Sequence, residues 1–258
     1  MTNENTLANS NAPELAGPYP VIPLRDMVVG PHAMTTIFMS RPMSVKAAEA
    51  SLQSFGGRII LVTQRDKSVD DPKPEDFWDV GVVGEIDQLL RLPDGSVKAL
   101  MHGTDRCRVS TFDRTGIYYK ASAEILKTEP CEAGDLEAYR RTLMRTLEDY
   151  AQNVKKMSLE HLKPIRAERD AVKACDIAAS VVPLSTEERI RFVGSTKPNE
   201  RFEILIEALE RELQSGQIEK RIQMRVKGQM EKNQREYYLN EQMKAIRKEL
   251  GLDGEGGR

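Results

Sequence analysis

The sequence predicts an α+β fold: an N-terminal β-rich domain, built as a small twisted sheet or pseudo-barrel with one short helix, followed by an α-helical bundle whose last helix is long and extended. Two observations predict it. Up to residue 126, short apolar runs are separated by glycine and proline, as in strands joined by turns. Beyond residue 126, apolar residues recur every three or four positions, which is the spacing of one helix face.

The domain boundaries follow from the same change of pattern. Residues 1–17 are polar and contain no apolar signal-peptide core, so we expect a disordered tail. We place the β-rich domain at 18–126, the helical bundle at 127–200 and a long connecting helix at 201–251, and we expect a flexible, glycine-rich end at 252–258.

Composition narrows the function classes. The 258 residues are 40% hydrophobic and 30% charged, with a formal net charge of −2, as in an ordinary soluble protein. No apolar stretch is long enough to cross a membrane, so we expect no membrane partner and a cytoplasmic location. The three cysteines are far apart, and neither a Cys-x-x-Cys nor a His-Glu-x-x-His motif is present, so we expect no disulfide framework and no metal site.

The first elements of the β-rich domain are a strand, a helix and a second strand. Residues 20–29 predict a strand whose prolines belong at an edge or at its start, because proline donates no ladder hydrogen bond. Residues 42–55 predict a short helix that Gly56-Gly57 ends, and residues 59–63 predict an apolar strand buried on both faces. The helix face expected to be buried consists of Val45, Ala48, Leu52 and Phe55.

A β-hairpin is predicted next. Pro93-Asp94-Gly95 supplies the turn between two apolar segments, and residues 117–126 predict one further strand. The residues expected to share one face of the hairpin are Val82, Ile86, Leu90 and Leu92 on the first strand and Val97, Ala99 and Met101 on the second.

Proline and capping residues divide the helical half. Residues 135–154 predict a helix with Asp135 as its N-cap, and Pro164 separates it from a second helix at about 168–182. A capping box, Ser185 to Glu188, begins a short third helix, and Pro198 introduces the longest one.

Two apolar stripes run along this longest helix, on roughly opposite sides. Either the helix kinks near Gly228 or its two halves meet different neighbours, and the alternative is one amphipathic helix packed on its own domain. The first stripe consists of Ile218, Ile222, Val226, Met230 and Tyr237, and the second of Leu239, Met243, Ile246 and Leu250.

Catalytic motifs are missing from the sequence. The chain has neither a Gly-x4-Gly-Lys-Ser/Thr phosphate loop nor a Gly-x-Ser-x-Gly elbow, and no nucleophile is spaced beside a base. We therefore expect no catalytic, cofactor-binding or metal-binding residue, and this chain alone should catalyse no reaction.

A long stretch, residues 18–251, resembles the N-terminal region of the bacterial Lon family of ATP-dependent serine proteases. The segments that carry the resemblance are Tyr19–Asp26 with Pro31-His32, the hairpin region from Gly81 to Gly103, and above all the signature Gln234–Gly251. In Lon-like proteins the long helix is followed by an AAA+ ATPase module and by a protease domain with a Ser-Lys dyad.

The resemblance implies that this chain stops before both of those domains, so that ATP, Mg²⁺ and the serine endopeptidase activity belong to the parent protein. It also implies a homohexamer. The implied role is substrate recognition: the capture of unfolded, misfolded or degron-bearing regulatory proteins for degradation, in protein quality control and the stress response.

Methionines supply most of the candidate client-binding residues. The chain has eleven, and flexible thioethers adapt to varied apolar segments, although each methionine could instead fill a gap in the core. Two adjacent tyrosines of the long helix join the set, because neighbours on a helix cannot both enter one core. The candidates are Met27, Met34, Met39, Met224, Met230, Tyr237, Tyr238 and Met243.

Two other functions stay open at this point. Residues 217–250 contain nine Lys or Arg against five Glu, an excess of four positive charges that would support weak, salt-dependent binding of DNA or polyphosphate. The same mixture of positive and negative charges is also typical of a solvated helix face. A purely structural oligomerisation module is the other alternative, and it predicts self-association without affinity for clients.

Overall fold

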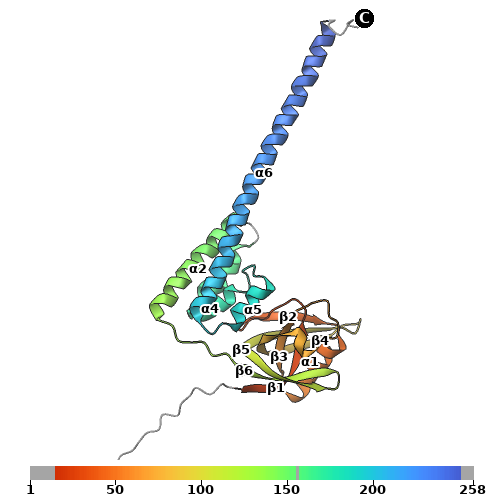
Figure 1. The fold of residues 1–258 in the computed structure, drawn as a ribbon, viewed down its shortest axis with the longest axis vertical. Helices are drawn as coiled ribbons and strands as arrows, with labels where there is room; N and C mark the ends of the chain where they lie inside the picture. The colour runs from red at the N-terminus through yellow and green to blue at the C-terminus, as the bar shows by residue number, and fades with distance from the viewer. Residues whose placement is uncertain (1–14, 155–156, 251–258) are drawn as a thin grey trace, which may run out of the picture. The chain divides into compact units, whose positions relative to one another are not determined.

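The computed structural model describes residues 15–154 and 157–250, in which a β-rich part precedes a helical part, as predicted (Figure 1). The described residues fall into two units that divide between Glu210 and Arg211. The β-rich part contains β1 (Leu15–Leu24), β2 (Met34–Met39), α1 (Pro42–Ser54), β3 (Arg58–Gln64), η1 (Pro74–Asp76), β4 (Phe77–Arg91), β5 (Val97–Thr115) and β6 (Tyr118–Ile125). The helical part contains α2 (Ala133–Val154), η2 (Leu159–His161), α3 (Leu162–Ala167), α4 (Ala171–Ala178), α5 (Thr186–Gly194) and α6 (Pro198–Glu249).

The expected tail and flexible end lie mostly outside the described residues. Positions 1–14 and 252–258 are not described. The last three residues of the expected tail, 15–17, instead begin strand β1, where Leu15 and Ala16 pair with β6.

One six-stranded sheet, in the order β2-β5-β4-β3-β1-β6, forms the β-rich part, and β6 also pairs with β5. The pairings thus return to β5, which curls the sheet into a pseudo-barrel. It is not a fully closed barrel, because β1 and β5 each change partners along their length. Strand β3 is buried on both faces, as predicted: Ile59 and Leu61 enter one core cluster, and Ile60 and Val62 enter another.

Strand β1, which contains three prolines, lies between β3 and β6 in the sheet order. Each half of β1 pairs with only one of these two neighbours. Residues Leu15–Pro20 pair with β6, and residues Val21–Leu24 pair with β3. Pro18, Pro20 and Pro23 therefore each lie in a half of β1 with an unpaired side, which is the kind of position where a strand tolerates proline.

Helix α1 ends as predicted at Gly56 and Gly57, whose φ angles are +61° and +84°. Its buried face differs from the expected one, because Leu52 is exposed and Val45 and Phe55 are only half-buried. Small side chains let the helix approach the sheet closely, and the hydroxyl of Ser51 donates to the carbonyl of Arg58. The buried face consists of Met43, Ser44, Ala47, Ala48 and Ser51.

The predicted hairpin is formed by β4 and β5, whose pairing runs to Arg91 and Val97 beside the turn. The register shifts between Ile86 and Gln88, and such a bulge exchanges the inward and outward faces of the strand beyond it. Leu90, which we expected on the inward face, is therefore exposed, whereas Leu89 packs against the core.

The helical part corrects three sequence predictions. Asp135 is not the N-cap of α2, because that helix begins at Ala133 and places Asp135 in its first turn. Pro164 does not interrupt a helix but lies in the first turn of α3, where its missing N–H has no partner to lose. The helix expected at 168–182 is shorter, since the carboxylate of Asp170 caps α4, which ends at Ala178.

Other helical predictions are confirmed. The side chains and backbone amides of Ser185 and Glu188 form the capping box of α5. Helix α6 begins at Pro198 and runs for 52 residues as one helix.

In the part of the chain that the structure describes, no helix is both long enough and apolar enough to span a membrane, and no cluster of His, Cys, Asp or Glu side chains has the form of a metal site.

Thiol labelling tests the packing of both parts. Burial raises the pKa of the Cys107 thiol to about 12 and that of Cys175 well above its ordinary value, whereas Cys131 is half-buried. Since the thiolate is the reactive form, we expect iodoacetamide near pH 8 to label Cys131 alone in the folded protein and all three cysteines in denaturant. Mass spectrometry distinguishes the sites, and rapid labelling of Cys107 before unfolding would contradict this packing.

Candidate functional site

An apolar groove lies between the loop that precedes β2 and the helices α4 and α5. Its volume is about 610 Å³. We call it the β–α groove. The residues of the loop and of β2 that line it are Asp26, Met27, Val28, Val29, Gly30, Ala33, Met34 and Thr35, and those of the helical side are Asp176, Ala179, Ser180, Leu184, Arg189, Phe192 and Val193.

Backbone hydrogen bonds hold the loop against β5. The amide of His32 donates to the carbonyl of Gly103 (2.9 Å), and the amide of Gly103 donates to the carbonyl of Ala33 (3.0 Å). The hydroxyl of Thr63 donates to the carbonyl of Met27 (2.7 Å). The loop wall is therefore anchored by its backbone, which leaves the side chains of Met27 and Met34 in contact with solvent.

Gly103 allows this close approach of loop and strand. A Cβ atom at this position would lie 2.3 Å from the carbonyl oxygen of Gly30, much closer than real Cβ contacts come. We expect Gly103→Ala to lower the free energy of unfolding by about 1–3 kcal/mol, because the added methyl group has no room. Urea unfolding measures the change. Gly134→Ala is the matched control, since its Cβ meets nothing within 4 Å, and equal effects of the two substitutions would contradict the assigned crowding.

The helical wall is fixed by caps at both helix ends. The guanidinium of Arg189 donates to the carbonyl of Ala179 (3.0 Å), the C-cap residue of α4, and to the carbonyl of Val182 (3.1 Å) in the segment that follows. Burial lowers the pKa of Arg189 from its ordinary value. The capping box of α5 fixes the start of the next helix, and α5 supplies Phe192 and Val193 to the groove.

A buried ionic cluster lies beside this wall. Arg106 of β5 makes two hydrogen bonds to the carboxylate of Asp176 on α4, and Arg201 of α6 approaches the same carboxylate to 3.6 Å. Arg201 also donates to the hydroxyl of Thr128 (2.8 Å), and Arg106 lies 5.6 Å from the ring centre of Phe192. The cluster thus connects the sheet with two helices and includes or contacts two groove residues, Asp176 and Phe192.

Burial and the neighbouring Arg106 charge lower the pKa of Arg201, and Asp176 opposes this effect. All three ionic side chains are almost inaccessible to solvent. The two guanidinium groups share the carboxylate of Asp176. Removing this negative charge would therefore affect two buried positive charges at once.

The predicted client-binding residues separate into three groups. Met27 and Met34 are exposed at 42% and 67%, and both line the β–α groove. Met39 is only 3% exposed, because strand alternation places it on the same face as Ile37, in the core, and its part in client binding stays a prediction. The remaining five candidates lie on α6 in the second unit and are all exposed (Met224, Met230, Tyr237, Tyr238 and Met243).

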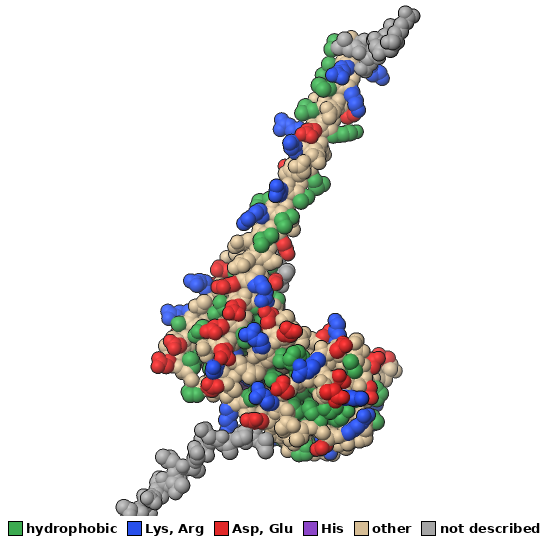
Figure 2. Space-filling model, viewed as in Figure 1, with side chains coloured by type: hydrophobic (Ala, Val, Ile, Leu, Met, Phe, Trp, Pro, Cys, Tyr) green, Lys and Arg blue, Asp and Glu red, His purple; other side chains and the backbone are tan. Residues whose placement is uncertain are grey.

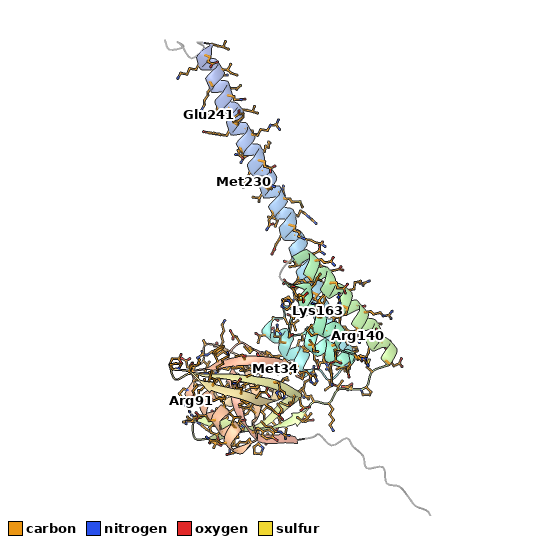
Figure 3. The ribbon with its side chains drawn as sticks, turned by 180° about the vertical axis from the view of Figure 1, so that it is seen from behind. Met34, Arg91, Arg140, Lys163, Met230 and Glu241 are labelled. Carbon is orange, nitrogen blue, oxygen red and sulfur yellow. The ribbon has the colours of Figure 1, made fainter. Side chains whose placement is uncertain are left out.

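Within residues 217–250, every described residue is exposed, including both apolar stripes. Figure 2 shows Lys and Arg side chains interspersed with hydrophobic ones along this helix. Figure 3 labels one methionine in each unit, Met34 on β2 and Met230 on α6. Three ion pairs join residues three or four positions apart, as expected of a solvated helix face (Lys227 with Glu231, Lys232 with Glu236, and Glu241 with Lys244).

The helical wall of the groove was not predicted. Ala179, Leu184 and Phe192 have the spacing of ordinary bundle residues, and nothing local in the sequence connects them with a loop about 150 positions earlier. The groove that results is apolar and anchored on two sides, which suits it to bind an apolar segment of another chain.

The chain is similar in sequence to known proteins over most of its length. Residues 18–211 match the family described as the ATP-dependent protease La (LON) substrate-binding domain. The chain is 41% identical over 232 residues to the Lon protease of Escherichia coli K12, covering 90% of this chain and 30% of that protein. It is 40% identical over 242 residues to the Lon protease of Brucella suis, covering 94% of this chain and again 30% of the relative.

A solved structure has the same fold. The N-terminal domain of the Mycobacterium avium complex Lon protease superposes with a TM-score of 0.60 at 18% identity, covering 74% of this chain and 97% of that one. The chain therefore spans about 30% of the length of the two full-length relatives and nearly all of the solved domain.

Proposed function

Because the chain belongs to the family of ATP-dependent protease La (Lon) substrate-binding domains, we propose that it captures unfolded protein segments and that the β–α groove is the capture site. The observation that supports this most strongly is the apolar groove with two exposed methionines on its loop wall. Thioether side chains adapt to many apolar partners, which a receptor for varied clients requires.

The proposal extends to the longer protease. Captured segments, including those of misfolded and degron-bearing proteins, pass to an ATP-dependent unfoldase and a serine protease. ATP and Mg²⁺ act in those regions and not in the groove. The working assembly is a homohexamer in the cytoplasm.

Binding of matched unfolded and folded clients tests the proposal. A fluorescent, reduced and carboxymethylated protein and its folded form are titrated with the 258-residue chain at about 0.05 M and about 0.5 M salt. We expect preference for the unfolded form at both salt concentrations, because apolar contacts are not screened as charges are. Equal binding of the two forms, or no binding of either, would contradict client capture.

The same titration decides the second candidate, which is binding of nucleic acid or polyphosphate by the basic part of α6. It is favoured by the excess of four positive charges in residues 217–250. A single-stranded DNA probe replaces the client. Affinity that falls steeply between the two salt concentrations, together with no preference for unfolded protein, would favour this candidate over client capture.

A further inference from the structure

Strand β2 ends the sheet on one side. Among the described residues, its six residues pair with β5 alone, from Met34 opposite His102 to Met39 opposite Val97. In an antiparallel pair, every second residue directs its N–H and C=O groups away from the partner strand. The far side of β2 therefore presents unpaired backbone donors and acceptors.

The sequence of β2 lacks the residues that usually protect such an edge. The sequence of β2, Met-Thr-Thr-Ile-Phe-Met, contains no charged residue, proline or glycine. Natural sheets commonly block their free edges with lysine, proline or a bulge, because an open edge accepts a further strand. Phe38 is 67% exposed on β2, with the ammonium group of Lys98 5.7 Å from its ring centre.

A seam lies beside the free edge. A cavity of about 310 Å³ is lined by residues 22–27 on one side and by residues 36–41 on the other. On the β1 side, Val21–Leu24 pair with β3 only. Arg41 reaches across this seam and donates to the carbonyl of Pro23 and to the side-chain oxygen of Gln64. The carbonyl of Pro23 is thus satisfied by a side chain, in a place where a neighbouring strand would otherwise supply a backbone amide.

The free edge continues directly into the β–α groove. Met34 and Thr35 line the groove, and the next four residues of β2 line the seam. Six residues of β2 span about 20 Å at roughly 3.3 Å per residue. An extended chain lying along β2 would therefore contact the groove at one end and the seam at the other.

We propose that an unfolded client binds by adding an extended strand to the free edge of β2, with its apolar side chains in the β–α groove and the seam. The inference rests on the proposed capture function and specifies its binding mode. The favoured client segment is extended, apolar at alternate positions and free of proline. Backbone hydrogen bonds supply affinity that does not depend on side-chain identity, which suits a receptor for many sequences.

Backbone methylation of a client tests the proposal without altering the protein. The probe is a fluorescent peptide of about ten residues in which valine and threonine alternate. One derivative carries N-methyl groups on the valine amides, and a matched derivative carries them on the threonine amides. In a strand these two sets of amides point to opposite sides, so only one set can face β2.

We expect one methylated set to weaken binding at least tenfold and the other to change it less than about threefold. Amide exchange measured by NMR should slow at alternate residues of β2 when the unmodified peptide binds. Equal effects of the two methylated sets, or slowed exchange confined to α6, would overturn strand addition.

Failure of the two proposals can be told apart. If the unfolded client binds but the unmodified peptide does not, strand addition is overturned and client capture stands. If neither binds, both proposals fail. Concentration-dependent dimerisation that the peptide competes away would show that the edge accepts a second copy of this chain, which would also overturn a client as its occupant.

Discussion

Replacing Asp176 with asparagine is expected to lower the free energy of unfolding by about 3–5 kcal/mol. The carboxylate is 1% exposed and is shared by the guanidinium groups of Arg106 and Arg201, which are themselves buried. The amide keeps the shape but removes the negative charge, so two buried cations lose their counterion. Removing one partner of a buried ion pair has this cost because the remaining charge stays desolvated.

Urea unfolding followed by circular dichroism measures the loss. Glu148→Gln is the matched control, because Glu148 pairs with Arg166 at the surface, with side chains 39% and 53% exposed, and should lose less than about 1 kcal/mol. Similar losses of unfolding free energy for the two variants would contradict the inference that the buried cluster stabilises the fold more than a surface ion pair does. We also expect Asp176→Asn to weaken client binding, since the cluster connects β5 with the helical wall of the groove.

Replacing Met27 and Met34 together with lysine is expected to weaken binding of an unfolded client by about tenfold or more. An apolar segment in the groove would then cover two ammonium groups, and burying an unpaired charge is costly. Because both side chains are exposed in the free protein, stability should change by no more than about 0.5 kcal/mol. The affinity is measured by fluorescence anisotropy at high salt, which suppresses ionic effects of the added lysines.

Met224→Lys with Met230→Lys is the matched control, because these methionines are 69% and 67% exposed on α6. It adds the same charge outside the groove, so we expect little loss of client affinity. A larger loss from the α6 pair than from the groove pair would move the binding site to the second unit.

The sequence predicted the features that local chemistry determines. The capping box of Ser185 and Glu188, the turn before Val97 and the doubly buried strand β3 each depend on neighbouring residues, and each forms as expected. The candidate site was predicted only in part, since Met27 and Met34 lie at the groove and Met39 does not.

What the sequence could not predict depends on contacts between distant segments. The bulge after Ile86 turns Leu90 outward although the alternation of apolar residues continues. The residues of α1 that face the sheet are mostly small, and Leu52 is not among them, because small side chains let the helix lie close to the sheet. The ionic cluster joins positions 106, 176 and 201, and no short-range pattern predicts that pairing.

Photo-crosslinking locates the captured client most directly. An unfolded client carrying benzophenone groups is irradiated with the 258-residue chain at high salt, and the linked positions are identified by mass spectrometry. Client capture in the β–α groove predicts links to residues 26–35 and 179–193. Links confined to residues 211–250, with the groove segments unmodified, would contradict it.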